Sequence, residues 1–482
     1  MPDQLTDDEH AIFQRLTAQI GHQRKRNELR SRYRDGEHIL DRMPVSVPVS
    51  MQSLAVPIGW PAKAISKFCV RLTPRGYSSE TGSSLVADIE DVFADNQMEF
   101  LEAQAIAAAA EHGCSFVFTT KGVDPLDPDV LITLRDAHSA SALLDPRTRR
   151  VTAALEVPDR STAVLYLPHR IAMLSRTNGG AWSVAGDVPN PSGRVLCAVY
   201  THGATIDRPF GTSRITRPLM GLTDMGVRTF LRSEVSADAY AAPRGFLIDV
   251  LEEQFEQDRN GRTTGWENII GAFSAIASQI DEETGEVLKP DVKMLPQLTM
   301  QPFGDQFRLI AAQVSGETSI PLQYLGVVSD SNPTSAAAVE ANEVDLVREV
   351  RGQFPSYNLG RKALAVNVLT ALYPQIIRDP AALADIRKIA PLWDDPRTRS
   401  VSEQSQFVAL QVQAGNFQAG TESTLRQLPI DPVEARRIAI ENRASFGLST
   451  LNQLLGQTAS PEATDLAATE TTTPAAAEVA AV

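Results

Sequence analysis

The chain has 482 residues, 43% of them hydrophobic and 22% charged, and a formal net charge of −14 at pH 7. This length predicts a folded protein with roughly two to four domains. The acidic balance argues against an open nucleic-acid-binding surface, because such surfaces concentrate Lys and Arg to displace counterions. It does not exclude a protein that lets DNA pass without holding it.

Three cysteines, Cys69, Cys114 and Cys197, lie far apart and form no CxxC pair. They are predicted to be free thiols, buried in apolar runs such as "ISKFCVRL", in a reducing compartment. The start of the chain, "MPDQLTDDEHAIFQRL", has no apolar core of a signal peptide, and no stretch approaches eighteen apolar residues. We therefore expect neither a signal peptide nor a membrane span.

Two helical blocks are predicted first, at residues 1 to about 45 and at 83–112. The first contains the basic run "HQRKRNELRSRYRDG", which is either a solvated helix face or a binding patch. The second ends at Gly113, a good helix stop, and the apolar "CSFVF" that follows is typical of a buried strand. From about 115 to 200, short strands separated by turn residues predict an antiparallel meander: "VLITL", "VTAALEV", "TAVLYL", "IAMLS" and "VLCAVY".

A helix is predicted over 213–241, with Pro243 ending it. A small mixed unit follows to about residue 302, with "GFLIDV" as a strand, an acidic helix from "LEEQFEQ", and strands around Trp266 and "VKMLPQL". "DQFRLIAAQVSGE" then predicts a helix with one apolar stripe.

The stretch "SDSNPTSAAAVEANEVDLV" begins as a polar loop and becomes a helix, since Asn332 can cap the free N–H groups and Pro333 suits the first helical turn. Helical spacing resumes in "RKALAVNVLTALYPQII", and two further helices are predicted at 401–415 and 432–445. The tail from "QTASPEATDL" onward lacks Lys, Arg and aromatic residues and is predicted to be disordered. The pattern as a whole predicts an α+β, mainly helical fold.

Motifs that carry catalysis are missing. The sequence holds no GxxxxGK[ST], GxGxxG, HExxH or GxSxG pattern, so no catalytic residue, cofactor or metal is predicted. The histidines occur singly, without a second ligand at helical or hairpin spacing, and are interpreted as surface or satisfied interior residues. They are His10, His22, His38, His112, His138, His169 and His202.

Two acidic clusters each leave two interpretations open. Asp124, Asp127 and Asp129 in "DPLDPD" could bind a cation, but the alternating prolines favour a turn. Asp394 and Asp395 in "LWDDP" could act as an acid–base pair, but a loop with helix-capping carboxylates is favoured. The residues alone thus indicate a non-enzymatic helical protein with a β insert.

The order of several local patterns resembles the portal proteins of tailed bacteriophages, in the branch found in long-tailed phages and prophages of actinobacteria. "ETSIPLQYLGVVSDSNPTSAAAVEANEVDLVREV" resembles that family's T-x-IP-x-x-x-LG turn, loop, NP-[TS]-S-A-x-A and acidic helix. "RSRYRDGEHIL", "FGTSRITRPLMGLTD" and "PLWDDPRTRS" resemble its R-Y-x-x-G, G-x-S-R and W-x-D-P segments. The match covers most of residues 25 to 450, and its specificity lies in order and spacing.

The resemblance implies a ring-forming, portal-type fold. Its regions would be an N-terminal wing of helices and meander at 1–212, a first stem helix at 213–241, a clip at 242–302, a second stem helix at 303–318, a tunnel loop at 319–334, a long helix returning to the wing at 335–399, a helical crown at 400–456 and a disordered tail at 457–482.

The function implied is that of a head–tail connector, a ring usually of twelve copies at one capsid vertex of the virion, assembled in the host cytoplasm. Double-stranded DNA would pass through its channel during packaging and ejection. The implied partners are other copies of the chain, the terminase large subunit, the major capsid or scaffold protein and a head-completion adaptor, with no membrane. The alternatives are a capsid-associated minor head protein and a hydrolase that uses an acidic cluster.

The resemblance also suggests site residues. The DNA-facing tunnel loop would be formed by Val327, Val328, Ser329, Asp330, Ser331 and Asn332. Arginines of the first stem helix would line the channel or pair with a neighbour, or would simply be solvated: Arg214, Arg217, Arg228 and Arg232. Glu340, Glu343 and Asp345 would face an adjacent subunit or favour the helix's N-terminal end. Trp266 and Trp393 are expected in a core or subunit contact rather than stacked on DNA.

Overall fold

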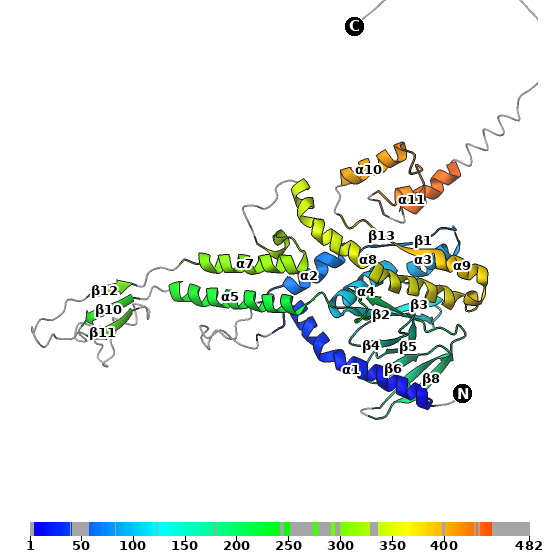
Figure 1. Cartoon of the computed structure of the whole chain (residues 1–482), viewed down its shortest axis with the longest axis horizontal. Helices are drawn as coiled ribbons and strands as arrows, with labels where there is room; N and C mark the ends of the chain where they lie inside the picture. The colour runs from blue at the N-terminus through cyan, green and yellow to red at the C-terminus, as the bar shows by residue number, and fades with distance from the viewer. Residues whose placement is uncertain are drawn as a thin grey trace, which may run out of the picture. The chain divides into compact units, whose positions relative to one another are not determined.

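The computed structural model describes residues 4–38, 40, 57–81, 83–122, 124–177, 180–241, 245–250, 273–277, 291–294, 299–327, 336–397, 401–428, 430–431 and 434–445. They have an α+β fold, as predicted (Figure 1). The chain divides into two compact units, Met1–Arg397 and Thr398–Val482.

The first helix, α1 (Asp7–Asp35), begins and ends with well-defined caps. Thr6 accepts from the backbone of Glu9, whose carboxylate accepts from the backbone of Thr6, so the two residues form a capping box. Gly36, at φ 72°, ends the helix about ten residues before the predicted end. Helix α2 (Trp60–Cys69) follows.

The predicted second helical block is two helices, α3 (Leu85–Asp95) and α4 (Met98–His112). Between them the side chain of Asn96 donates to the carbonyl of Val130 at 2.7 Å and accepts from the N–H of Ile132 at 2.8 Å. These bonds hold the break between α3 and α4 against a strand more than thirty residues away. The spacing of neighbouring residues cannot reveal such a distant partner. Gly113, at φ 103°, ends α4 as predicted.

The strands do not form the single predicted meander. Five of them do, in the order β4 (Ala140–Leu144), β5 (Val151–Glu156), β6 (Thr162–Tyr166), β7 (Arg170–Ser175) and β8 (Ser183–Pro189). "VLITL" and "VLCAVY" lie in a separate antiparallel sheet, where β2 (Cys114–Lys121) is flanked by β3 (Val130–Asp136) and β9 (Cys197–Thr201). The prediction was wrong for these strands because β9 pairs with a strand about eighty residues earlier, which spacing alone does not encode.

The long helix α8 (Ala336–Leu372) packs on β9. Its Gly360 allows the close approach, because a Cβ there would lie 2.5 Å from the carbonyl oxygen of Val199. The helix does not continue to residue 399 as predicted. It is followed by a 3₁₀ turn, η4 (Ile376–Arg378), helix α9 (Pro380–Lys388) and strand β13 (Ile389–Trp393), which pairs antiparallel with β1 (Pro74–Ser79).

The main hydrophobic core of the first unit lies between α2, α4, α8 and the sheet of β2, β3 and β9. Arg361 of α8 is fully buried beside it and donates from Nε to Glu102 of α4 at 2.8 Å. Glu102 also accepts from the hydroxyl of Tyr200, and the Arg361 guanidinium lies 4.6 Å from the ring centroid of Trp393. This buried, paired charge ties α8 to α4, β9 and β13.

Two further helices lie in the segments where stem helices were predicted. They are α5 (Arg217–Ala241) and α7 (Gln301–Thr318), which is followed by a 3₁₀ turn, η3 (Leu322–Leu325). In sequence they bracket a three-stranded sheet in the order β11 (Phe273–Ala277), β10 (Gly245–Val250), β12 (Asp291–Met294). The acidic helix predicted at "LEEQFEQ" and the strand around Trp266 lie outside the described residues.

The second unit is helical in its described part. It contains α10 (Val401–Gln413), α11 (Glu422–Leu425) and helical residues 434–445. Val408, Ala435 and Ala439 are buried, and the Gln404 amide donates to the carbonyl of Gln427. The two helices predicted here are confirmed, α11 was not predicted, and the tail lies outside the described residues.

Candidate functional site

Helices α5 and α7 lie side by side and antiparallel (Figure 1). Directly before α5, the hydroxyl of Thr216 donates to Glu317 near the end of α7 at 2.9 Å. Further along α5, the ring of Phe230 lies 4.5 Å from that of Phe307, near the start of α7. The predicted apolar stripe of α7 packs into the core through Ile310, Ala311 and Val314.

A shallow groove of about 660 Å³ runs between the two helices. Its lining residues come from both helices: Pro218, Gly221, Leu222, Met225 and Arg228 from α5, and Gln313, Gly316 and Glu317 from α7. At 3.6 residues per turn, one side of α5 presents five residues together. We call these five residues, Arg217, Gly221, Met225, Arg228 and Arg232, the α5 stripe.

The α5 stripe combines charge with exposed apolar surface. Arg217 and Arg232 are exposed and Arg228 is half-buried, and none of the three forms an ion pair with another described residue. Met225, which was not predicted as a site residue, is 41% exposed. Met225 lies eight residues after Arg217 and three before Arg228, and this helical spacing was the signal that could have revealed it.

Arg214 does not belong to this stripe, so the prediction that it sits on the stem helix is wrong. It lies before α5 and is buried. Its guanidinium donates to the carbonyls of Ala64 at 2.6 Å and Thr318 at 2.7 Å, and forms an ion pair with Glu349 of α8. The group also lies 4.1 Å from the ring centroid of Phe68. Arg214 therefore joins α2, α7 and α8 inside one chain.

The predicted tunnel loop is only partly described. Val327 is 7% exposed and packs in the main core, so the prediction that it faces DNA is wrong. The core holds this end of the loop because the Trp60 indole N–H donates to the carbonyl of Leu325. Residues 328–332, and the predicted helix start at Asn332 and Pro333, lie outside the described residues.

The three acidic residues singled out near the start of α8 differ in burial. Glu343 is buried, forms an ion pair with Arg71 at 2.8 Å and accepts from the hydroxyl of Tyr324. It is therefore satisfied within its own chain and does not face an adjacent subunit. Glu340 and Asp345 are exposed.

Trp393 lies against protein rather than open solvent. Its ring stacks on Phe354 with centroids 4.9 Å apart, and its N–H donates to Asn358 at 2.7 Å. The expected core contact is confirmed for Trp393.

Carboxylates in both acidic clusters accept hydrogen bonds from, or form ion pairs with, other residues of the chain. The Asp124 carboxylate accepts from the N–H of Leu126, and the Asp127 carboxylate accepts from the N–H of Asp124, which confirms the predicted turn. Asp395 binds Arg351 and Arg397 rather than capping a described helix. Burial raises the pKa of Asp395, but the hydrogen bonds from the two arginines outweigh it and lower the pKa to about 2.

Two histidines are not isolated, contrary to the prediction. His112, Asp136 and His138 each place one potential metal ligand atom within 4.8 Å of the others. Burial, reinforced by the neighbouring His138, lowers the pKa of His112 to about 3, so its imidazole is neutral. The spacing Asp136-x-His138 was the sequence signal for two of the three residues of this cluster.

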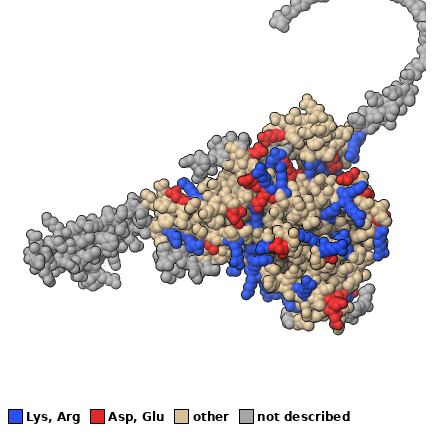
Figure 2. Space-filling view, in the orientation of Figure 1, with Lys and Arg blue, Asp and Glu red and all other residues tan. Residues whose placement is uncertain are grey.

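Charge on the drawn face of the molecule is mixed. Figure 2 shows Lys and Arg interspersed with Asp and Glu, without one large field of either sign. Among the helices that the structure describes, none is both long and apolar enough to cross a membrane.

Two portal proteins are similar to the chain. That of Mycobacterium phage L5 is 24% identical over 377 residues, covering 76% of this chain and 74% of that protein. That of Mycobacterium phage D29 is 24% identical over 379 residues, with the same coverage. These relatives confirm the predicted resemblance to phage portal proteins. No protein-family model matches the chain.

Distant likenesses also exist among solved structures. A chain from the virion of a native gene transfer agent particle has a TM-score of 0.37 and 12% identity, covering 77% of this chain and 90% of that one. A chain from the neck of an empty gene transfer agent particle has a TM-score of 0.42 and 13% identity, covering 81% and 96%.

Proposed function

We propose that this chain is the portal protein of a tailed phage, a ring of twelve copies at one capsid vertex through which double-stranded DNA enters and leaves. The observation that carries this proposal is the similarity to two mycobacterial phage portal proteins over three quarters of the chain. The acidic net charge fits a channel that conducts a polyanion without holding it.

In this proposal α5 and α7 are the stem helices, and the sheet of β10, β11 and β12 belongs to the clip. Ring closure requires two different faces of each copy to meet head to tail. The α5 stripe suits one of these faces, because it sets the exposed Met225 among arginines that have no ion-pair partner among the described residues. A neighbouring copy would cover the methionine and supply carboxylates from its other face.

The loop at 328–332 is proposed to face the channel and meet the DNA. The chain enters this loop from Val327, which is held in the core, and α8 begins at Ala336 after it. The terminase large subunit, a head-completion adaptor and the capsid or scaffold protein would bind other surfaces of the ring in the virion.

We propose no enzymatic activity. The hydrolase alternative needs free carboxylates, whereas Asp124 and Asp127 stabilise a turn and Asp395 is paired with two arginines.

The assignment of the α5 stripe is tested by changing Arg217, Arg228 and Arg232 together to Gln. Analytical ultracentrifugation would follow assembly, and complementation of a portal-deficient phage would follow DNA packaging. If the stripe is a subunit contact, rings dissociate at lower protein or higher salt concentration, and packaging falls in proportion. Intact rings that fail to package would instead place the arginines in the channel. Normal assembly and normal packaging would contradict both roles.

A matched control removes the same charge elsewhere. Arg147, Arg160 and Arg208 are exposed in loops of the β-rich region, and their change to Gln should leave assembly and packaging unchanged.

Deleting 328–332, which spares the buried Val327, should leave rings intact but impair packaging. A deletion that abolishes folding would show that the loop assignment is wrong.

A further inference from the structure

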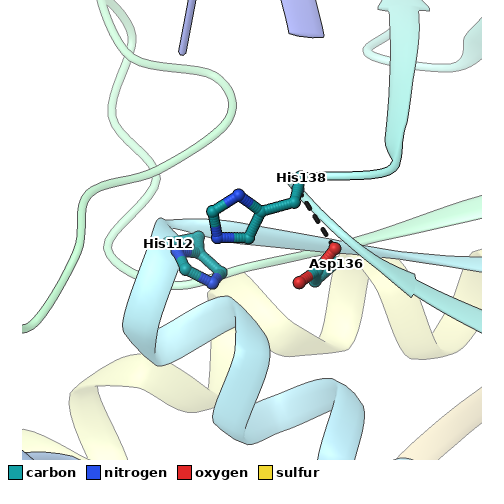
Figure 3. Close-up of side chains that lie close together, drawn as sticks. All are labelled: His112, Asp136 and His138. Carbon is teal, nitrogen blue, oxygen red and sulfur yellow. Dashed lines mark hydrogen bonds between the residues drawn. The ribbon is translucent and has the colours of Figure 1, made fainter. Parts of the chain in front are cut away.

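Three side chains with metal-ligand chemistry gather where α4 ends and β3 turns toward β4 (Figure 3). His112 is the last residue of α4, Asp136 the last of β3, and His138 lies two residues further on. The two imidazole rings are nearly perpendicular, with centroids 4.7 Å apart. Elements far apart in the sequence thus bring two nitrogen ligands and one oxygen ligand together.

Hydrogen-bonding side chains surround the two imidazoles. The hydroxyl of Ser31 donates to Oε1 of Glu111 at 2.7 Å, so its oxygen can accept a proton from Nε2 of His138, 3.4 Å away. Nε2 of His112 lies 3.5 Å from the same Glu111 oxygen. Both Nε2 atoms thus lie near these oxygens of Ser31 and Glu111.

The Nδ1 atom of His112 is buried and unsatisfied within the described part of the chain. The His112 side chain is 3% exposed, and Nδ1 has no hydrogen-bond partner among the described residues. A buried polar atom without a partner costs free energy, and such an atom in a native fold calls for an explanation.

The carboxylate of Asp136 is positioned by the turn. Its Oδ1 accepts from the N–H of His138 at 3.1 Å and from the hydroxyl of Ser139 at 3.0 Å. Its Oδ2 accepts no hydrogen bond from the described residues, which leaves that oxygen for a ligand. Asp136 and His138 are half-buried, so solvent can reach the open side of the cluster.

We propose that His112, Asp136 and His138 bind one divalent transition-metal ion of the zinc type. Two imidazole nitrogens and one carboxylate oxygen are ligands that Zn²⁺ accepts, with water completing the coordination. Glu111 and Ser31 lie beside the two Nε2 atoms and would complete the polar surroundings of the ion. Because Ser31 belongs to α1, the ion stabilises the junction of α1, α4 and the β3–β4 turn.

The charged groups around the cluster limit its affinity for a divalent cation but do not prevent binding. Arg30 donates to the carbonyl of His112 at 3.0 Å, and Arg34 is paired with Glu111. The positive charges of Arg30 and Arg34 balance the negative charges of Glu111 and Asp136, so these four groups carry no net charge before the ion binds. We therefore expect an affinity in the micromolar range rather than that of a closed structural zinc site.

The test uses the full chain, treated with a chelator and then titrated with Zn²⁺ by calorimetry and native mass spectrometry. One ion per chain should bind, and the thermal unfolding midpoint should rise with Zn²⁺ concentration. Co²⁺ in the same site should give a visible absorption band typical of nitrogen and oxygen ligands.

Variants locate the ion. Asp136→Asn and His138→Gln should each weaken Zn²⁺ binding at least about 100-fold, and Ser31→Ala about 10-fold. His22→Gln, which changes an exposed histidine of α1, is the matched control and should bind like the unchanged chain. Circular dichroism verifies that each variant is folded. The proposal is overturned if the unchanged chain binds no Zn²⁺ at micromolar concentration, or if folded D136N and H138Q bind it as well as H22Q does.

Discussion

Arg214 offers the most direct test of how α5 and α7 are attached to the rest of the first unit. Arg214→Met keeps an extended, apolar side chain over Phe68 but removes the guanidinium. The carbonyls of Ala64 and Thr318 then lose their charged donor, and Glu349 loses its ion-pair partner.

The cost follows from these contacts. A hydrogen bond to a charged group contributes about 1.5–3 kcal/mol, and breaking a buried ion pair costs about 3–5 kcal/mol. The Glu349 side chain is 32% exposed and can be rehydrated, so the lower end applies to the pair. We expect local destabilisation of about 3 kcal/mol at the junction of α7 and α8, which corresponds to opening that is about 100-fold more frequent.

Hydrogen exchange followed by mass spectrometry measures this opening segment by segment. Peptides that cover the end of α7 and the region of Glu349 should exchange faster in Arg214→Met, while peptides from β4 to β8 should not change. Arg348→Met is the matched control, because Arg348 is 78% exposed and 3.9 Å from Asp345. The reasoning is refuted if the two variants exchange alike at the junction.

Two further predictions concern packing and pH. Gly360→Ala should destabilise the first unit by about 3 kcal/mol, because its Cβ would lie 2.5 Å from the carbonyl oxygen of Val199. A Cβ added at Gly352 on the same helix has no neighbouring atom within 4 Å, so Gly352→Ala should stabilise the helix slightly. Equal denaturation midpoints for the two variants would contradict this prediction. Burial raises the pKa of Glu9, but hydrogen bonds from Arg170, Thr6 and His169 outweigh it and lower the pKa from 4.5 to about 2. The resulting stabilisation, about 2 kcal/mol after solvent screening, is present above pH 4.5 and lost as the pH falls toward 2. Glu9→Gln should abolish this part of the acid dependence in denaturation at pH 5 and pH 3, and an unchanged pH profile would contradict the assignment.

Local patterns predicted much of the secondary structure. Gly113 was expected to end a helix and does so at φ 103°, and the apolar stripe of α7 packs as its spacing indicated. Such features depend on neighbouring residues, and so the sequence is informative about them.

Long-range partners explain the failures. Arg214 fitted a helical period with later arginines, but its hydrogen-bond partners, Ala64 and Thr318, lie more than a hundred residues away on either side. Asn96 broke a helix because of its bonds to a distant strand. His112 and His138 met because β3 folds back beside the end of α4. Partners of this kind are set by the tertiary fold and leave no local pattern.

We propose that copies of this chain close into a ring with a channel. Negative-stain electron microscopy of the purified protein tests this directly. Particles with a central hole and twelvefold symmetry are expected. Monomers, or compact dimers without a hole under conditions in which the chain is folded, would contradict it.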